Sequence, residues 1–226
     1  MCGRYSISKP LSTVINTFKL KNIAGTYQPQ YNAYPSQFLP LLTNEKPDTL
    51  QFYQWGLIPS WSKYFSINRG FTNARSETLL KKASFRSSFL HQRCLILSDG
   101  YYEWQQSSLG KIPYRITPKL GQLWAYAGLW AIWTKGSITH LTFTIITTSA
   151  KPSIAHIHHR MPVILPFDTH KQWLDNASST ALLQHLLQSS NEPMHYYTVS
   201  PSINKPQNNS ADLINPYFYN QSPPLF

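Results

Sequence analysis

Residues 93–104 read Arg93-Cys94-Leu95-Ile96-Leu97-Ser98-Asp99-Gly100-Tyr101-Tyr102-Glu103-Trp104, and this stretch decides the fold class. Its two apolar and aromatic runs, 93–97 and 101–104, predict β-strands, and the Asp99-Gly100 pair between them predicts a turn. Further strands are predicted at 38–42, 49–55, 112–117, 123–133, 141–148, 161–165 and 195–199. Because helices do not alternate regularly with these strands, the pattern indicates an α+β domain rich in β-structure and not a doubly wound sheet.

Helices are predicted between some of these strands. Leu11, Val14, Ile15 and Phe18 recur at the spacing of one helix face, and Ser8-Lys9-Pro10 precedes them as a cap. The other predicted helices are 76–91 in two pieces, one that contains Trp173 and Leu174 and is capped by Asp168 or Thr169, and 181–187. Residues 21–37 are predicted to be loop, and residues 201–226, rich in Ser, Asn and Pro, a wrapped or loose tail. No linker precedes this tail, so residues 1–226 are predicted to form one domain.

The composition favours a basic intracellular protein. Twenty Lys and Arg against nine Asp and Glu give a net charge of +11, which suits a polyanion such as nucleic acid, although basic proteins without such a partner are common. The two cysteines, Cys2 and Cys94, offer no disulfide framework and indicate a reducing compartment. The N-terminus lacks an apolar signal region, and no apolar run approaches the length of a membrane span. We therefore expect a soluble intracellular protein, in the cytoplasm or nucleoid if the source is bacterial.

The chain begins Met1-Cys2-Gly3-Arg4, and a small second residue permits removal of the initiator methionine. Removal would leave Cys2 with an α-amine and a thiol on adjacent carbons, whose ordinary pKa values near ~7.7–8.0 and ~8.5 supply nucleophile at neutral pH. Such a 1,2-aminothiol attacks an aldehyde twice, first through nitrogen to give a Schiff base and then through sulfur to close a thiazolidine ring. The alternative is that Met-Cys is simply how the reading frame begins.

Asn73 and Arg75 stand two residues apart in a segment that precedes a predicted helix. If that segment is extended, both side chains face the same side. Asn73 could then hydrogen-bond a substrate oxygen or the Cys2 amine, and Arg75 could hold a phosphate through its planar guanidinium. An Asx turn ahead of the helix explains the same residues equally well.

Glu103 lies between Tyr102 and Trp104 on a predicted strand. In aromatic surroundings a carboxyl group resists ionisation, so Glu103 could hold a proton near neutral pH and act as a general acid or base. The alternative is an exposed strand carboxylate, which is the usual situation of a Glu on a strand.

Three histidines and an arginine occur within His156-Ile157-His158-His159-Arg160. In an extended conformation His156, His158 and Arg160 share a face, where His158 could transfer protons and Arg160 could bind a phosphate. A His-x-His pair can also ligate a metal, but further ligands such as Cys94, His140 or Asp99 would have to converge on it. A structural histidine cluster at a turn is the remaining alternative.

The order of these motifs resembles the SRAP family, the SOS-response-associated peptidase family of abasic-site-processing proteins. The shared motifs are Met1 to Arg4, Trp55-Gly56-Leu57-Ile58-Pro59 with Trp61, Asn73-Ala74-Arg75-Ser76-Glu77, Arg93 to Ile96, Asp99 to Trp104, Ala127-Gly128-Leu129-Trp130, Ile145 to Thr148, Ile157 to Pro162, and Val199-Ser200. The resemblance extends from residue 1 to about Pro216. Ser76 and Ser98-Asp99 depart from the residues usual in the family, and none of these departures changes a proposed catalytic atom.

The resemblance implies a single SRAP domain with a curled, barrel-like, mainly antiparallel sheet flanked by short helices. It implies that the protein acts in the DNA damage response, without metal or cofactor and as a monomer, on single-stranded DNA that contains abasic sites. The implied catalytic residues are Cys2 as nucleophile, Asn73 positioning the N-terminus and the sugar, Glu103 transferring protons, and His158 assisting proton transfer and reversal. The implied DNA-binding residues are Arg4, Arg75 and Arg160 on phosphates, Trp104 stacking on a base, and Thr147 lining the DNA channel.

The implied reaction is a covalent thiazolidine crosslink between mature Cys2 and the aldehyde of the abasic site. Removal of Met1, by the chain itself or by an aminopeptidase, must come first, and this release of its own first residue is the chief peptidase role implied. A Schiff base at C1′ also acidifies the C2′ proton, so strand cleavage by β-elimination is an expected side activity.

Two other functions remain open from the residues alone. N-terminal-nucleophile amidohydrolases of the glutaminase type also begin Met-Cys-Gly, and there the cysteine attacks an amide carbon. Their fourth residue is typically Ile, however, whereas this chain has Arg4, and they lack the Glu-Trp and His-x-Arg-Met-Pro elements. The other function is a single-strand binding module without catalysis, in which Cys2 would be dispensable.

Overall fold

The structure is a computed structural model that describes residues 2–108, 110–188 and 193–219. Five strands close into a barrel: β4 (Phe38–Thr43), β5 (Thr49–Trp55), β7 (Arg93–Ser98), β10 (Trp124–Lys135) and β11 (Ile138–Ser149). They pair antiparallel in the order β11–β10–β7–β4–β5, and β5 then pairs in parallel with β11, where Gln54 lies opposite Thr142. This last pairing leaves no open edge in the ring. The prediction of a curled, barrel-like and mainly antiparallel sheet is confirmed.

Bulky apolar side chains fill the barrel. The rings of Trp55 and Phe143 stack with centroids 6.1 Å apart, and both are fully buried. Gly128 on β10 is needed for close packing, because a Cβ atom there would lie 2.4 Å from Ile96 Cδ1 and 2.8 Å from Cys94 Sγ. Cys94 is thus a buried packing residue of the barrel.

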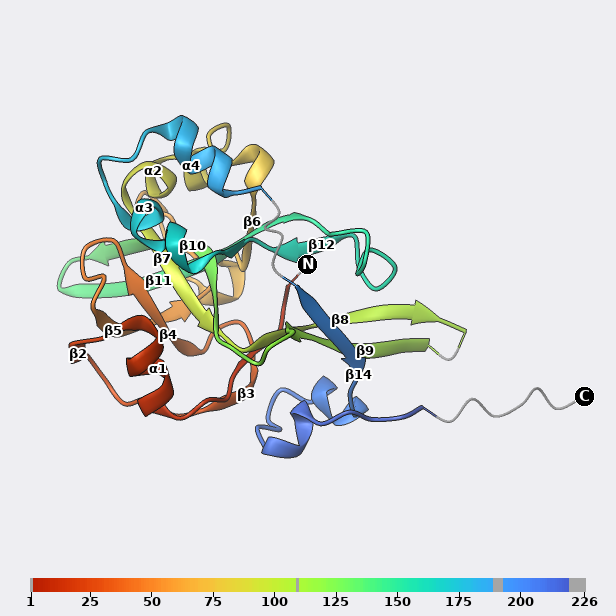
Figure 1. The fold of residues 1–226 in the computed structure, drawn as a ribbon. Coiled ribbons are helices and arrows are strands. Elements are labelled where there is room, and N and C mark those ends of the chain that lie inside the picture. Colours follow the sequence, from red (N-terminus) through yellow and green to blue (C-terminus); the bar gives the residue numbers. More distant parts are fainter. Residues whose placement is uncertain (1, 109, 189–192, 220–226) are drawn as a thin grey trace, which may run out of the picture.

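A second sheet extends from the barrel, as Figure 1 shows on its right-hand side. Its strands, in spatial order, are β14 (Met194–Thr198), β9 (Gly110–Pro118), β8 (Gly100–Ser107), β1 (Tyr5–Ile7) and β3 (Gln30–Ala33). The chain therefore leaves the barrel at the end of β7 and enters the second sheet at the start of β8. The bend predicted at Asp99-Gly100 is present, but the strands on its two sides belong to different sheets and do not pair with each other.

The Asp99 carboxylate stabilises this change of sheet. It accepts hydrogen bonds from the Ser6 hydroxyl at 2.5 Å and the Ser8 backbone N–H at 2.7 Å, and it forms a buried ion pair with Arg115 at 3.0 Å. Ser8 therefore binds Asp99 and does not cap the first helix, which begins after Pro10 without a side-chain cap. Asp99 thereby fixes the strand that follows Cys2.

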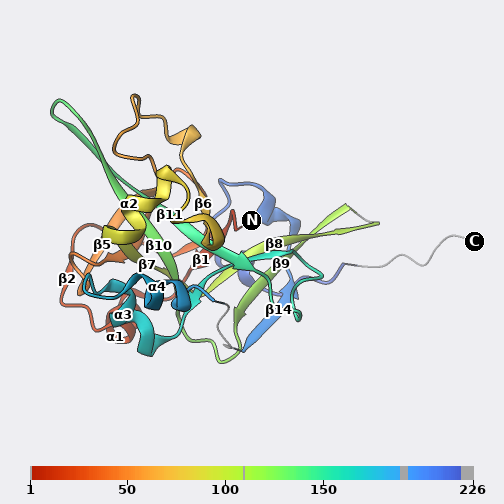
Figure 2. The same ribbon diagram turned by 90° about the horizontal axis from the view of Figure 1, so that it is seen from above.

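Short helices cover the barrel, and the loops carry the remaining strands. The helices are α1 (Leu11–Phe18), α2 (Ala83–His91), α3 (His170–Leu174) and α4 (Thr180–Leu186), with 3₁₀ turns η1 (Ile67–Arg69), η2 (Ser76–Thr78), η3 (Phe167–Thr169), η4 (Pro201–Asn204) and η5 (Ala211–Ile214). The remaining strands are β2 (Asn22–Ile23), β6 (Asn73–Arg75), β12 (Arg160–Pro162) and β13 (Ile164–Leu165). Figure 2 shows the helices against the barrel and the second sheet projecting away from it.

Most predicted elements are confirmed, and two differ. The 21–37 segment is not all loop, because it contains β2 and β3, and the predicted strand at 161–165 is split into β12 and β13. The predicted tail packs through η4 and η5 against the second sheet as far as residue 219, and its last residues, 220–226, lie outside the described part of the chain. Among the described residues, no helix has both the length and the apolarity needed to cross a bilayer.

Candidate active site

Cys2 lies three residues before β1, whose pairing with β8 and β3 holds the N-terminal segment in place. Its side chain is fully buried, and its Sγ lies 3.8 Å from the Arg4 carbonyl oxygen. Burial raises the pKa of the Cys2 thiol far above its ordinary value, and the negative charge of Glu103 raises it further. This shift refers to the chain in which Met1 precedes Cys2, so the ordinary thiol pKa near ~8.5 expected for the mature N-terminal cysteine stays a prediction.

Asn73 reaches Cys2 from across the sheet. β6 runs parallel to β11, with Asn73 opposite Ile145, so the Asn73 side chain projects beside the N-terminal segment. Its Nδ2 donates a hydrogen bond to the Cys2 backbone carbonyl at 2.9 Å, and its Oδ1 accepts no backbone N–H from the described part of the chain, so the alternative of an Asx turn is wrong. Its Oδ1 is buried and has no hydrogen-bond partner within the described residues, so it can accept a hydrogen bond from a ligand or from the mature N-terminal amine.

Glu103 is a buried carboxyl group on β8, with 5% of its surface exposed, so the interpretation as an exposed strand carboxylate is wrong. Burial raises its pKa from 4.5 to about 7. The predicted resistance to ionisation is confirmed, and the group can gain or lose a proton near neutral pH. Its negative charge is also felt at Cys2, which couples the two groups electrostatically.

His158 lies beside Glu103, just before β12. Its Nδ1 is 3.8 Å from Glu103 Oε1, and it lies 3.0 Å from the Arg160 backbone nitrogen and 3.1 Å from the Arg160 carbonyl oxygen. This nitrogen therefore accepts from the Arg160 N–H in one tautomer of the ring and donates to the Arg160 carbonyl in the other. Burial lowers the pKa of His158, and the His159 ring stacks on it with centroids 4.4 Å apart. The residues that the structure describes contain no cluster of three or more His, Cys, Asp or Glu side chains able to hold a metal.

A cavity of about 450 Å³ opens beside this carboxyl–imidazole pair. It is lined by Glu103, Trp104, Lys111, His158 and Asn204. The Trp104 indole Nε1 donates a hydrogen bond to Asn204 Oδ1 at 2.8 Å, which holds the ring at the cavity edge. Lys111 and Asn204 were not among the residues predicted from the sequence. Strand alternation across the β8–β9 hairpin could have indicated Lys111, whereas no local signal marks Asn204.

The predicted phosphate-binding arginines differ in their surroundings. Arg75 is exposed on β6, whereas Arg4 is half-buried and donates hydrogen bonds to Asn32 Oδ1 at 2.7 Å and to the Ile203 carbonyl at 3.1 Å. Arg160 is buried and binds the Glu77 carboxylate through both terminal nitrogens, at 2.5 Å and 3.1 Å.

Thr147 is fully buried, and its carbonyl accepts a hydrogen bond from Arg160 Nη2 at 2.6 Å. Its hydroxyl oxygen also lies 3.4 Å from Arg160 Nη2, so Thr147 supports Arg160 and does not reach the surface.

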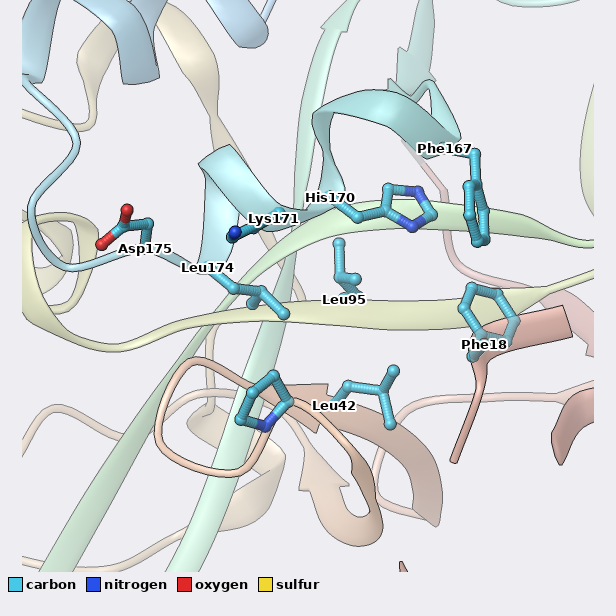
Figure 3. Close-up of a pocket in the computed structure, with 9 residues that line it drawn as sticks. Phe18, Leu42, Leu95, Phe167, His170, Lys171, Leu174 and Asp175 are labelled. Carbon is cyan, nitrogen blue, oxygen red and sulfur yellow. The ribbon is translucent and has the colours of Figure 1, made fainter. Parts of the chain in front are cut away.

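A larger cavity, of about 500 Å³, lies elsewhere, between α1, α3 and strands β4 and β7 (Figure 3). Most of its wall is apolar and is formed by Phe18, Leu42, Leu95 and Leu174. The His170 ring also lines the cavity, and its Nε2 lies 3.1 Å from the Leu165 carbonyl oxygen. None of the predicted catalytic residues lines it, so the smaller cavity beside Glu103 is the candidate site.

The fold and the site define a class of protein: a barrel-based α+β domain with Cys2 close to a buried Glu and to a partly buried Asn and His. Comparison with known proteins gives the family. The sequence model of the family described as "SOS response associated peptidase (SRAP)" matches residues 1–206. The chain belongs to this family, as its motifs predicted. Among its relatives, "Abasic site processing protein YoaM" of Bacillus subtilis is 40% identical over 221 residues, which cover 95% of this chain and 97% of the relative.

A vertebrate relative and a solved structure extend the comparison. "Abasic site processing protein HMCES" of Gallus gallus is 32% identical over 226 residues, which cover 85% of this chain and 67% of the relative. A crystal structure of a protein from Bacteroides thetaiotaomicron superposes with a TM-score of 0.87 at 28% identity and covers 96% of this chain and 100% of that one. The family and the barrel fold thus agree.

Proposed function

We propose that this protein processes abasic sites in single-stranded DNA by forming a thiazolidine crosslink through the mature N-terminal Cys2. The observation that carries the proposal is the hydrogen bond from Asn73 to the Cys2 carbonyl, beside a carboxyl group whose pKa is about 7. An aldehyde is the electrophile that a 1,2-aminothiol captures best, and an abasic sugar in its ring-opened form supplies one. The names of the relatives from Bacillus subtilis and Gallus gallus support the same substrate.

The chemistry starts at nitrogen, because only attack by the amine gives the Schiff base whose carbon the sulfur can then close on. The α-amine adds to the C1′ aldehyde carbon, and protonated Glu103 gives its proton to the departing hydroxyl, which leaves as water. The thiol then transfers its proton to the Glu103 carboxylate as sulfur bonds to the same carbon and closes the ring. Glu103 is restored, and the net change is the loss of one water. A group with a pKa of about 7 is suited to both directions of transfer.

His158 and Asn73 support these steps. His158 places Nδ1 3.8 Å from Glu103 Oε1 and also lines the cavity, so its ring can relay protons between the carboxyl group and the cavity. The unpaired Asn73 Oδ1 offers an acceptor to the mature amine or to a sugar hydroxyl. The same groups, run in reverse, would reopen the thiazolidine, and a Schiff base that loses its C2′ proton before ring closure would give strand cleavage.

The cavity beside Glu103 fits a single-stranded partner. Trp104 offers a ring face for base stacking, which contributes about 1–3 kcal/mol per base without sequence preference. Lys111 on the cavity wall and exposed Arg75 supply positive charge for phosphates, in keeping with the net charge of +11. Arg4 and Arg160 are proposed to bind phosphates as well, Arg160 only after it leaves Glu77.

Substitution of Cys2 tests this function. Cys2→Ser should abolish a heat-stable adduct with an oligonucleotide that contains an abasic site, while binding to the same oligonucleotide with a tetrahydrofuran site, which has no aldehyde, stays intact. An adduct that persists in Cys2→Ser would overturn the proposal. Release of ammonia from glutamine at useful rates would instead favour an amidohydrolase, and an absence of any adduct from the wild-type chain would favour a binding module.

A further inference from the structure

Glu77 and Arg160 form the best-aligned ion pair at the edge of the candidate site. The two terminal nitrogens of Arg160 lie 2.5 Å and 3.1 Å from the two carboxylate oxygens of Glu77. This is the bidentate arrangement that makes guanidinium–carboxylate pairs strong. Arg160 Nη2 also donates to the Thr147 carbonyl at 2.6 Å. The Arg160 side chain is 9% exposed and that of Glu77 49%, so the cation is fixed from the protein side while the anion faces solvent.

The same arginine connects to His158 through its main chain. The Arg160 backbone N–H donates to His158 Nδ1 at 3.0 Å, and that nitrogen lies 3.8 Å from Glu103 Oε1. A shift of the Arg160 backbone would therefore also disturb the imidazole. Glu77 follows β6 by two residues, so its pairing ties the segment that carries Asn73 to the strand that follows His158.

A phosphate that approaches Arg160 meets an occupied guanidinium. Both terminal nitrogens face Glu77, and a phosphate can use the planar fork only if the carboxylate gives way. The negative charge of Glu77 also repels the phosphate. Glu77 thus has two effects. It holds the Arg160 side chain in place beside His158, and it competes with DNA phosphates for the Arg160 guanidinium.

We propose that Glu77 is a positioning residue that restrains Arg160, and through it His158, at the cost of one phosphate contact to DNA. This inference rests on the proposed function, because it assigns Glu77 a part in the same reaction. It predicts opposite effects of one substitution on binding and on chemistry. Glu77→Gln keeps the shape of the side chain but loses the charge and the second acceptor oxygen.

The test uses the full-length protein and two single-stranded oligonucleotides of equal sequence, one with a tetrahydrofuran site and one with a true abasic site. In Glu77→Gln, the Kd for the tetrahydrofuran oligonucleotide should fall. The slope of the logarithm of the binding constant against the logarithm of the salt concentration should become steeper by about 0.7, which corresponds to one added phosphate contact on a single strand. The single-turnover rate of adduct formation, measured at saturating protein, should fall by roughly tenfold to hundredfold, as expected for a misplaced catalytic group. Glu77→Asp, which restores the charge, should recover part of the rate.

Glu45→Gln is the matched control, because Glu45 is exposed in the turn between β4 and β5 and carries the same charge. It should leave both the Kd and the rate at wild-type values. Tighter binding of equal size in Glu45→Gln would attribute the gain to net charge and overturn the competition at Arg160. A wild-type rate in Glu77→Gln would overturn the positioning role, while a wild-type chain that forms no adduct would overturn the proposed function itself.

Discussion

Asn73 donates a hydrogen bond from its side-chain amide to the backbone carbonyl of Cys2 over 2.9 Å, across 71 positions of sequence. β6 brings Asn73 to this place by pairing in parallel with β11, and β1 brings Cys2 there by pairing with β8. The N-terminal segment is therefore fixed by both the barrel and the second sheet.

Replacing Asn73 tests this anchoring. Asn73→Ala removes the donor to the Cys2 carbonyl together with the free Oδ1 acceptor, so the N-terminal segment loses its fixed position. We expect the rate of adduct formation to fall roughly tenfold to hundredfold, the equivalent of about 1–3 kcal/mol in the barrier. Rapid-quench measurement with abasic single-stranded DNA checks the rate, and a Kd unchanged for the tetrahydrofuran oligonucleotide is the control. A rate equal to that of the wild type would show that the bond is only structural.

Glu103→Gln tests the proton-transfer step. The side chain keeps its shape but can neither give nor take a proton, so adduct formation or reversal should slow by about 10²-fold or more. The wild-type rate should lose its acid-catalysed contribution as the pH rises through about 7, the pKa of Glu103, and the variant should show no inflection there. Rates of adduct formation measured between pH 5 and 9 check this prediction. An inflection near pH 7 that is still present in Glu103→Gln would show that another group titrates there.

The raised pKa of Glu103 also predicts how stability depends on pH. The unfolded chain ionises this carboxyl near 4.5 and the folded chain only near 7, so folding is penalised increasingly as the pH rises between those values. Below about pH 4.5 the penalty is absent, and above about pH 7 it is complete, at up to roughly 1.4 kcal/mol per pH unit of the interval. Urea unfolding should therefore find Glu103→Gln more stable than the wild type at pH 8 and nearly equal at pH 4.5. Equal stability at both pH values would contradict a buried carboxyl.

Lys111 and Trp104 separate electrostatic from stacking contributions to DNA binding. Lys111→Gln should weaken binding to single-stranded DNA and reduce its logarithmic salt slope by about 0.7. Trp104→Ala should cost about 1–3 kcal/mol with little change in that slope. Lys21→Gln, which removes an exposed lysine paired with Asp48 at 3.2 Å, is the control and should change neither value. Fluorescence anisotropy over a salt series measures both, and equal slopes for Lys111→Gln and the control would place DNA away from this cavity.

Asp99→Asn tests the joint between the two sheets. The substitution leaves Arg115 buried without its carboxylate partner and weakens the bonds to Ser6 and Ser8. Removal of one member of a buried pair typically costs about 3–5 kcal/mol, so the free energy of unfolding should fall by that order. Chemical denaturation supplies the measurement. A loss below about 1 kcal/mol would mean that the sheets are held together by apolar packing alone.

Local patterns predicted the elements well and their partners poorly. The helix face of Leu11, Val14, Ile15 and Phe18 forms α1, and the long apolar runs form the barrel strands. β2 and β3 escaped prediction because they are short and partly polar, and they owe their conformation to backbone pairing with β5 and β1. The bend at Asp99 has a clear local signal, but its role in changing sheets depends on pairings that no local pattern contains.

The candidate site divides in the same way. The burial of Glu103 was predictable from its aromatic neighbours. The Asn73 side chain lies at Cys2, but it binds the backbone carbonyl and not the amine that was expected as its partner. The pairing of Arg160 with Glu77 joins residues 83 positions apart, and the contact of Trp104 with Asn204 joins residues 100 apart. Contacts of such separation are set by the closed barrel and the docked C-terminal segment, so they become visible only in three dimensions.

The central claim concerns one cysteine, and intact-mass spectrometry tests it most directly. Purified protein is incubated with a single-stranded oligonucleotide whose uracil has been excised, and its mass is compared with that of the untreated protein. We expect a chain that lacks Met1 and a product equal to the sum of that chain and the abasic oligonucleotide minus one water, with Cys2 as the modified residue in the fragment spectrum. A product attached to any other residue, or one formed equally well by a chain that retains Met1, would contradict it.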